Sequence, residues 1–148
     1  MERVGQSIVE RRVFVDTSAI LAIVDSLDRH HAQAMEIMGR CANEQYTLLT
    51  TRFVVVETHA GLLRAVGFHE ARAFLQNGME EIAEVLTEES DYRRAKEIVF
   101  QHKDKDYSLC DAISFAVMDR LNLSLAFAFD DHFRQYGLST PIGQTNWP

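Results

Sequence analysis

The sequence predicts an α/β fold in which helices cover both faces of a mostly parallel sheet. Short apolar runs such as Val13–Val15 and Leu125–Phe129 alternate with longer segments of helical periodicity. The first run shows no alternation of polar and apolar residues, as expected for a strand that is buried on both faces. With 148 residues, of which 47% are hydrophobic, the chain most simply forms one domain, residues 1–148, with a substantial core.

Helix caps, periodicity and glycine stops predict the elements of the first half. Asp16, Thr17 and Ser18 supply a turn and a helix cap after the first strand, and Thr51 can cap a later helix. Gly67 can end that helix, and Gly78 the next. We expect a polar lead-in at 1–11 and a strand at 12–16, followed by helices from 19 and at 29–42. A second strand at 46–50 and helices at 52–66 and 68–78 complete this half.

The second half continues the alternation of strands and helices. An apolar stripe at helical spacing, formed by Tyr92, Ala95, Ile98 and Val99, predicts an amphipathic helix. A strand, this helix, a charged loop, a buried helix, a strand, a loop with a helical turn and an edge strand are expected in this order: 80–87, 88–103, 104–106, 108–121, 123–129, 130–140 and 141–143. The acidic stretch of this half is expected to face water: Glu80, Glu81, Glu84, Glu88, Glu89 and Asp91.

Charge and cysteine content exclude several classes of protein. The formal net charge of −7 argues against non-specific coating of nucleic acid, although bound cations could still reverse the local sign of a carboxylate site. Cys41 and Cys110 are far apart and form no CxxC motif, which indicates a reducing compartment. Residues 1–6 lack the apolar stretch of a secretory signal, and no apolar run has the length of a membrane span. We therefore expect a cytoplasmic domain without membrane contact.

Two acids directly follow the apolar strands. Asp16 comes after the first strand, and Asp130 comes after Leu125–Phe129. The carboxyl ends of parallel strands meet at one edge of the sheet, where open α/β folds place their ligands. Asp16 could instead be a turn or cap residue. One of Asp130 and Asp131 is expected to be a turn residue, and the geometry favours Asp130 as the residue aimed into the cleft.

Two further acids lie on predicted helices. Glu57 falls on or beside the apolar stripe of its helix, although it could be a boundary residue that pairs with an arginine. Asp111 stands three residues after Ser108, in a pattern that resembles a capping box. An acid in the first helical turn is also favourable because of the helix dipole. The helix that follows is almost unbroken in its apolar character, which indicates that Asp111 points into the domain.

Four acids at one sheet edge would repel one another. Two unit charges about 4 Å apart cost roughly 4 kcal/mol at an effective dielectric constant near 20. Such a cluster is expected mainly where it binds hard divalent cations, which prefer oxygen ligands. The residues alone therefore predict a divalent-metal carboxylate site formed by Asp16, Glu57, Asp111 and Asp130.

At these residues the chain resembles the PIN-domain ribonucleases, of the kind that act as VapC toxins in type II toxin–antitoxin pairs. The matching blocks are 13–19, 28–34, 56–58, 108–115 and 127–133, and their order and spacing hold over residues 12–143. The family often has a threonine two residues before the fourth acid, where this chain has Ala128. The resemblance implies a three-layer α/β/α fold with a central sheet of four to five strands.

The resemblance also implies an activity and a set of partners. Asp16, Glu57, Asp111 and Asp130 would bind Mg²⁺ or Mn²⁺ and act in catalysis, with Thr17, Ser18 and Asp131 in support. The chain would be a metal-dependent endoribonuclease that hydrolyses RNA phosphodiester bonds and leaves a 5′-phosphate and a 3′-hydroxyl. Its expected partners are an RNA substrate, an antitoxin protein and a second copy of itself. The resemblance identifies no RNA-binding residues.

Alternative functions differ in the residues that they require. A response-regulator receiver needs adjacent acids after its first strand and a lysine after its last, and a haloacid-dehalogenase phosphatase needs an aspartate at position 18, which is Ser18. A catalytically inactive PIN fold that only binds a partner, or a housekeeping RNA-processing nuclease, remains open. The histidines lack zinc-enzyme spacing, so His31 and His132 are expected to be structural or hydrogen-bonding residues. Candidate phosphate contacts near the cleft are Arg11, Arg12, Arg29, Arg64, Lys103 and Lys105.

Overall fold

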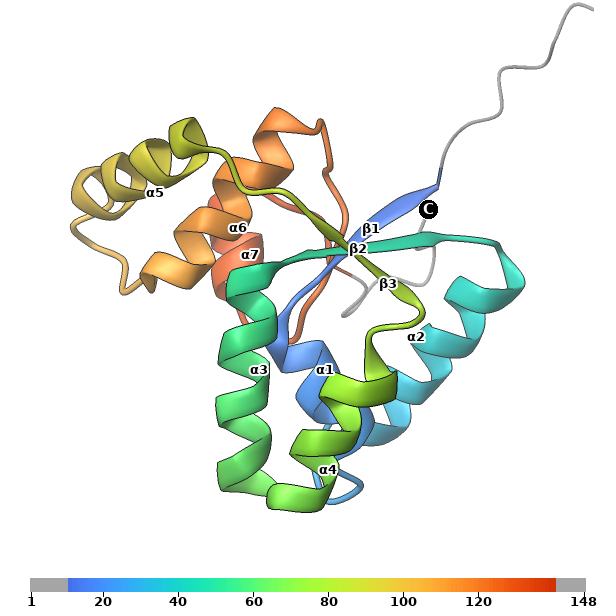
Figure 1. Cartoon of the computed structure of the whole chain (residues 1–148). Coiled ribbons are helices and arrows are strands. Elements are labelled where there is room, and N and C mark those ends of the chain that lie inside the picture. The colour runs from blue at the N-terminus through green and yellow to red at the C-terminus, as the bar shows by residue number, and fades with distance from the viewer. Residues whose placement is uncertain (1–10, 141–148) are drawn as a thin grey trace, which may run out of the picture.

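A four-stranded, wholly parallel sheet forms the centre of the computed structural model, which describes residues 11–140 (Figure 1). The strand order is β3-β2-β1-β4, so the chain crosses over between non-adjacent strands. The strands are β1 Arg12–Val15, β2 Thr47–Thr51, β3 Ile82–Val85 and β4 Ala126–Phe127. The predicted α/β fold with a parallel central sheet is therefore confirmed. The expected lead-in, apart from Arg11, and the expected strand at 141–143 lie outside the described residues.

Helices cover the sheet on both sides and complete the three layers. In Figure 1, α5, α6 and α7 lie together on one side of the sheet, and α1, α2 and α4 lie on the other. The helix α3 contacts α1, α4 and α6. The helices are α1 Thr17–Val24, α2 His31–Asn43, α3 Arg52–Ala65, α4 Phe68–Ala73, α5 Glu89–Gln101, α6 Leu109–Arg120 and α7 His132–Tyr136, and a π-helical turn, η1 Phe74–Gly78, extends α4.

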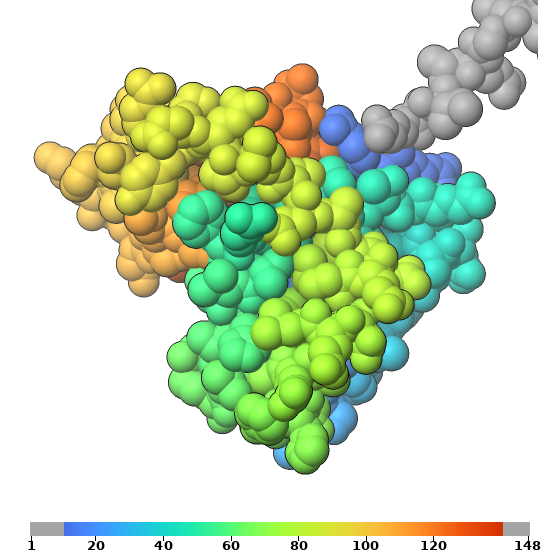
Figure 2. All heavy atoms as spheres, in the orientation of Figure 1, coloured from blue at the N-terminus to red at the C-terminus, as the bar shows by residue number. Residues whose placement is uncertain are grey.

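The buried centre of the sheet explains the unbroken apolar character of β1. Phe14 pairs with Leu49 on one side and with Ala126 on the other. Helices cover both faces, and the side chains of Val13, Phe14 and Val15 are fully buried. The space-filling view shows side chains of α3, α4 and the segment around β3 packed over one face of the molecule (Figure 2). Within residues 11–140, no helix combines the length and apolar character needed to cross a membrane.

The predicted cap and stop of α3 are confirmed. The hydroxyl of Thr51 accepts a hydrogen bond from the backbone N–H of Val54 at 3.3 Å. Gly67 has a φ of 102° and donates its N–H to the Leu62 carbonyl, a conformation that residues with a side chain rarely adopt. The helical segment that begins at Phe68 ends at Gly78 as predicted, although Gly78 is the last residue of η1 and has no positive φ.

The last predicted strand is much shorter than residues 123–129. The backbone N–H of Asp16 still bonds to the Phe127 carbonyl at 3.0 Å, but the N–H of Phe129 bonds to the hydroxyl of Ser18 instead of a neighbouring strand. Because β1 ends at Val15, the chain beyond Phe127 has no strand left to pair with on that side. Leu125 also forms an isolated parallel bridge with Ser139.

The acidic stretch before and within α5 is not wholly solvated as expected. Asp91 has only 3% of its surface exposed, and its side chain accepts a hydrogen bond from the backbone N–H of Glu88 in a capping box. Arg120 of α6 lies against the same carboxylate, with Nε 2.9 Å from Oδ1. This buried charge is therefore paired, as buried charges must be.

Candidate metal centre

Asp16 is buried at the junction of β1 and α1. It is the N-cap of α1, and its Oδ2 accepts hydrogen bonds from the backbone N–H and the hydroxyl of Ser18 at 3.1 and 2.6 Å. Burial raises the pKa of Asp16 to about 7, although the two hydrogen bonds from Ser18 oppose the shift. The neighbouring carboxylates of Asp111 and Glu57 raise the same pKa. Both the cap role and a cluster of acids, which the sequence presented as alternatives, are therefore present.

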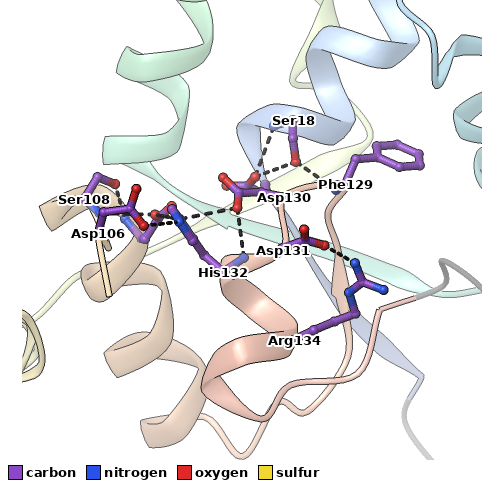
Figure 3. A network of polar contacts seen from close by, with 10 residues as sticks. Ser18, Asp106, Ser108, Phe129, Asp130, Asp131, His132 and Arg134 are labelled. Atoms are coloured by element: carbon purple, nitrogen blue, oxygen red, sulfur yellow. Dashed lines mark hydrogen bonds and ion pairs between the residues drawn. The ribbon is translucent and has the colours of Figure 1, made fainter. Parts of the chain in front are cut away.

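Ser18 and Thr17, the predicted supporting residues, face different neighbours. The hydroxyl of Ser18 donates to Asp16 and accepts from the backbone N–H of Phe129 at 3.0 Å (Figure 3). The hydroxyl of Thr17 lies 3.5 Å from the Val54 carbonyl and accepts a hydrogen bond from Thr58 at 3.2 Å. Ser18 therefore fixes Asp16 directly, whereas Thr17 connects the start of α1 to α3.

Asp111 is held by the capping box that its spacing from Ser108 predicted. The Ser108 hydroxyl accepts from the Asp111 N–H at 3.0 Å, and Asp111 Oδ2 accepts from the Ser108 N–H at 3.2 Å. Only 7% of Asp111 is exposed. Burial raises its pKa, and the nearby charge of Asp130 raises it further, while a hydrogen bond from His132 lowers it. Asp111 thus points into the domain, as the apolar character of α6 indicated.

Asp130 and Asp131 point to different surroundings. The Oδ1 atom of Asp130 accepts from the backbone N–H of His132 at 2.9 Å and lies 3.3 Å from the ring Nδ1 of His132. Asp131 is exposed and pairs with Arg134 on the surface, away from the other acids (Figure 3). The expectation that Asp130 is the residue aimed into the cleft agrees with this geometry, whereas Asp131 is a turn residue at the start of α7 and lies outside the supporting position expected for it.

Glu57 approaches the cluster from the second turn of α3. It is half-buried, and its charge acts on both Asp16 and the thiol of Cys110. Burial raises the pKa of Cys110, and the charge of Glu57 and a hydrogen bond to its carboxylate raise it further. Glu57 therefore lies on the same side of the molecule as Asp16, on the boundary between the core and solvent.

The four predicted acids thus converge at the carboxyl edge of the sheet. The closest group of potential ligand atoms comprises Asp111, Asp130 and His132, whose atoms lie within 4.8 Å of one another. Asp16 lies near enough to Asp111 and Glu57 for their charges to raise its pKa, whereas the group within 4.8 Å includes neither Asp16 nor Glu57. Within residues 11–140, no lysine or arginine forms an ion pair with Asp16, Asp111 or Asp130.

This donor set fits a hard divalent cation. In each of three aspartates, one oxygen collects the hydrogen bonds from the described residues: Oδ2 of Asp16, Oδ2 of Asp111 and Oδ1 of Asp130. The second oxygen of each carboxylate accepts none from residues 11–140. Free carboxylate oxygens around an uncompensated negative charge are the ligands that Mg²⁺ and Mn²⁺ prefer.

His132 is the residue of this cluster that the sequence analysis did not assign to the site. Its ring Nδ1 lies 2.8 Å from Asp111 Oδ2, and its Nε2 lies 3.1 Å from Asp106 Oδ1. The prediction of a hydrogen-bonding role for His132 is correct. Its position two residues after Asp130 was the available signal, but the contact with Asp111 depends on how α6 and α7 pack together.

Two of the predicted phosphate contacts lie far from the acids. Arg11 precedes β1 and Arg12 is its first residue, whereas Asp16 follows its end, and a four-residue strand spans about 13 Å. Arg12 donates to the Leu121 carbonyl at 3.0 Å, and Arg11 donates to the Glu44 carbonyl at 3.1 Å. These arginines connect elements at the opposite edge of the sheet, so their expected place near the cleft is wrong.

The fold and the cluster together define an α/β protein with a group of carboxylates at the carboxyl edge of its sheet that could hold a divalent cation. The chain belongs to the PIN-domain family, whose domain matches residues 13–138. The resemblance predicted from the sequence is therefore confirmed over nearly the whole described region.

Relatives with known activities share both sequence and fold with this chain. It is 31% identical over 126 residues to the 23S rRNA-specific endonuclease VapC20 of two Mycobacterium tuberculosis strains, which covers 84% of this chain and 94% of the relative. The crystal structure of M. tuberculosis VapC20, described as a sarcin–ricin loop cleaving toxin, superposes with a TM-score of 0.76 at 29% identity, covering 86% of this chain and 96% of that one. The structure of VapBC2 from Rickettsia felis, bound to a promoter DNA fragment, shares the fold with a TM-score of 0.64 at 10% identity, covering 87% and 96%.

Proposed function

We propose that this chain is a divalent-metal-dependent endoribonuclease and the toxin of a type II toxin–antitoxin pair. The observation that carries the proposal is the convergence of Asp16, Glu57, Asp111 and Asp130 from four separate elements on one sheet edge. The similarity to an rRNA endonuclease over 94% of its length supports the same function. Asp16 and Asp111 are buried without a lysine or arginine partner among residues 11–140, which is costly and argues against an inactive fold that retains them.

Asp16, Asp111 and Asp130 would hold the cation, each through the carboxylate oxygen that accepts no hydrogen bond from residues 11–140. Glu57 would lie beside them. A bound Mg²⁺ or Mn²⁺ would lower the pKa of a water molecule and neutralise charge on the phosphodiester. We favour these hard cations because the donor set consists mainly of oxygen atoms.

The side chains around the cation would orient its ligands and accept a proton from the attacking water. Ser18 keeps one oxygen of Asp16 occupied and so orients the other, and Ser108 does the same for Asp111. Glu57 lies at the boundary with solvent, which suits a carboxylate that takes up a proton from the attacking water. Hydrolysis at the phosphorus would then leave a 5′-phosphate and a 3′-hydroxyl.

Large-subunit ribosomal RNA is the substrate class that we infer, because both curated relatives are named for cleavage of 23S rRNA. An antitoxin protein is the inferred partner, since a structural neighbour is a VapBC complex. A homodimer and a cytoplasmic location remain predictions from the sequence analysis. A housekeeping RNA-processing nuclease is the competing function, and it would require no antitoxin to protect the cell.

Cleavage of a synthetic sarcin–ricin hairpin tests the activity directly. We expect the purified protein to cut this hairpin in Mg²⁺ or Mn²⁺, to be inactive in excess chelator, and to cut a hairpin of scrambled sequence far more slowly. Asp16→Asn should abolish cleavage while the protein stays folded, and Asp131→Asn provides the matched control because Asp131 faces the surface. Full activity of Asp16→Asn, or full activity in chelator, would contradict the proposal. Growth arrest on expression, relieved by Asp16→Asn, would separate a toxin from a housekeeping enzyme.

A further inference from the structure

His132 contacts two of the candidate metal ligands at once. Its ring Nδ1 lies 2.8 Å from Asp111 Oδ2 and 3.3 Å from Asp130 Oδ1, and its backbone N–H donates to Asp130 Oδ1 at 2.9 Å. Asp111 belongs to α6, whereas Asp130 lies in the turn after β4. The first residue of α7 therefore joins carboxylates that come from two different elements (Figure 3).

The contacts of His132 act on one oxygen of each aspartate. Asp111 Oδ2 accepts hydrogen bonds from the Ser108 backbone N–H and from Nδ1 of the His132 ring. Asp130 Oδ1 accepts one from the His132 backbone N–H. The other oxygen of each carboxylate accepts no hydrogen bond from residues 11–140. A carboxylate fixed in this way cannot rotate freely, so its second oxygen keeps one direction before a cation arrives.

The imidazole ring is itself held in place. Nε2 lies 3.1 Å from Asp106 Oδ1, and the buried ring of Tyr107 packs edge-on against His132 with centroids 5.4 Å apart. Asp106 is 97% exposed, so water can replace that contact at little cost. The contact from Nδ1 matters more for the site, because Nδ1 faces the buried carboxylate of Asp111.

We propose that His132 is a positioning residue of the metal centre, which holds Asp111 and Asp130 in the arrangement that binds the cation and does not ligate the cation itself. This inference rests on the metal-dependent function proposed above. The geometry favours positioning over direct ligation, because at 2.8 Å from a carboxylate oxygen Nδ1 acts as a hydrogen-bond donor. A nitrogen that donates a proton has no lone pair to offer a metal.

Three substitutions of His132 distinguish the roles of the two ring nitrogens. In His132→Asn the side-chain amide can place a donor near the former Nδ1, whereas in His132→Gln it reaches the former Nε2. His132→Phe keeps the ring shape without any donor. We expect Mn²⁺ affinity, measured without RNA by titration of the free-ion electron paramagnetic resonance signal, to fall about 10- to 100-fold in the Phe and Gln variants. The Asn variant should recover most of the wild-type affinity.

The same variants show how the inference could fail. Equal Mn²⁺ affinity in all three variants and the wild type, or an Asn variant as weak as the Phe variant, would overturn it. Electron spin echo modulation from a directly bonded nitrogen in the Mn²⁺-loaded wild type would make His132 a ligand and would also overturn it. If the Phe variant does not fold, the comparison of Asn with Gln carries the test. A wild type that binds no Mn²⁺ would remove the positioning role together with the site.

Failure of the proposed ribonuclease can be told apart from failure of this inference. Mn²⁺ binding in the expected order of variants, in a protein that cleaves no RNA, would uphold the positioning role and reject the nuclease. Where cleavage is present, the Mn²⁺ concentration for half-maximal rate should rise in the Phe and Gln variants, while the KM for RNA stays unchanged.

Discussion

The hydroxyl of Ser18 accepts a hydrogen bond from the backbone N–H of Phe129 at 3.0 Å and thereby joins residues 111 positions apart in the sequence. The same hydroxyl donates to Asp16 Oδ2 at 2.6 Å. One side chain therefore connects the acid after β1 to the chain segment that leads from β4 to Asp130. This hydroxyl and the hydrogen bond from the Asp16 N–H to the Phe127 carbonyl together fix the relative placement of two candidate ligands.

Replacement of Ser18 by alanine should loosen the site and destabilise the fold. The backbone N–H of Phe129 would lose its acceptor, and Asp16 would lose a donor that lowers its pKa. We expect the free energy of unfolding to fall by about 1–3 kcal/mol and the cleavage rate by about 10- to 100-fold. Chemical denaturation and RNA cleavage measure the two effects. Ser26→Ala, at an exposed position, is the control, and a Ser18→Ala protein indistinguishable from it would refute the role of this hydroxyl.

Asp16 should make the metal-free protein less stable as the pH rises. Its pKa is raised from 3.8 to about 7 in the folded state, so between these values the folded protein binds more protons than the unfolded chain. The contribution of Asp16 to the free energy of unfolding should therefore be largest near pH 4 and decrease toward pH 7, by up to about 1.4 kcal/mol per pH unit. Thermal unfolding in chelator at several pH values tests this expectation.

Asp16→Asn provides the matched comparison for this pH dependence, because the amide cannot ionise. Its stability curve should be flatter between pH 4 and 7, and at pH 7 the metal-free variant should be more stable than the wild type. Identical curves for the two proteins would show that Asp16 does not have the raised pKa that its burial implies.

The ion pair of Asp91 and Arg120 should hold α5 against α6. Loss of Arg120 in Arg120→Met would leave a buried carboxylate without its partner, at a cost of about 3–5 kcal/mol. Burial raises the pKa of Asp91, but the hydrogen bonds from Arg120 and from the Glu88 N–H outweigh it, so the pKa is lowered overall. The pair therefore contributes above the ordinary aspartate pKa, and its contribution is lost as the pH falls through the lowered value.

Chemical denaturation of the double variant Asp91→Asn/Arg120→Met tests whether the unpaired Asp91 carboxylate causes the loss of stability in Arg120→Met. It should recover part of the stability, because no unpaired charge remains buried. If Asp91→Asn lowers the stability of Arg120→Met by as much as it lowers that of the wild type, the two residues do not interact, and the pairing is contradicted.

Two glycines in helical segments should respond to alanine in opposite ways. A Cβ atom at Gly78 would lie 2.8 Å from Cδ2 of Phe74, whereas at Gly39 nothing lies within 4 Å. We expect Gly78→Ala to destabilise the protein by about 1–3 kcal/mol through overpacking, and Gly39→Ala to stabilise it by about 0.5–1 kcal/mol. Calorimetric melting temperatures that shift in the same direction would contradict the packing around Phe74.

The sequence identified those site residues whose position follows from local rules. Asp16 directly follows a buried strand, Asp130 directly follows the apolar run around β4, and Asp111 stands at a fixed distance from its cap, Ser108. Parallel strands bring such positions to one edge whatever the details of packing.

Contacts between remote elements could not be predicted in the same way. The partner of Asp91 lies 29 residues away on another helix, so Asp91 looked like part of a solvated stretch. His132 reaches Asp111 only because α7 packs beside α6. The early end of β4 follows from the end of β1 at Val15, and the free N–H of Phe129 finds its acceptor in the remote Ser18 hydroxyl. Each of these contacts is set by tertiary structure, and the neighbouring residues do not identify the remote partner.

Crystals grown with Mn²⁺ and measured at an anomalous wavelength test the central claim most directly. The account predicts a strong anomalous difference peak at the carboxyl edge of the sheet, within bonding distance of carboxylate oxygens of Asp16, Asp111 and Asp130, and no such peak in crystals of Asp16→Asn. A peak bound elsewhere on the molecule, or a cluster that stays without a peak at millimolar Mn²⁺, would contradict it.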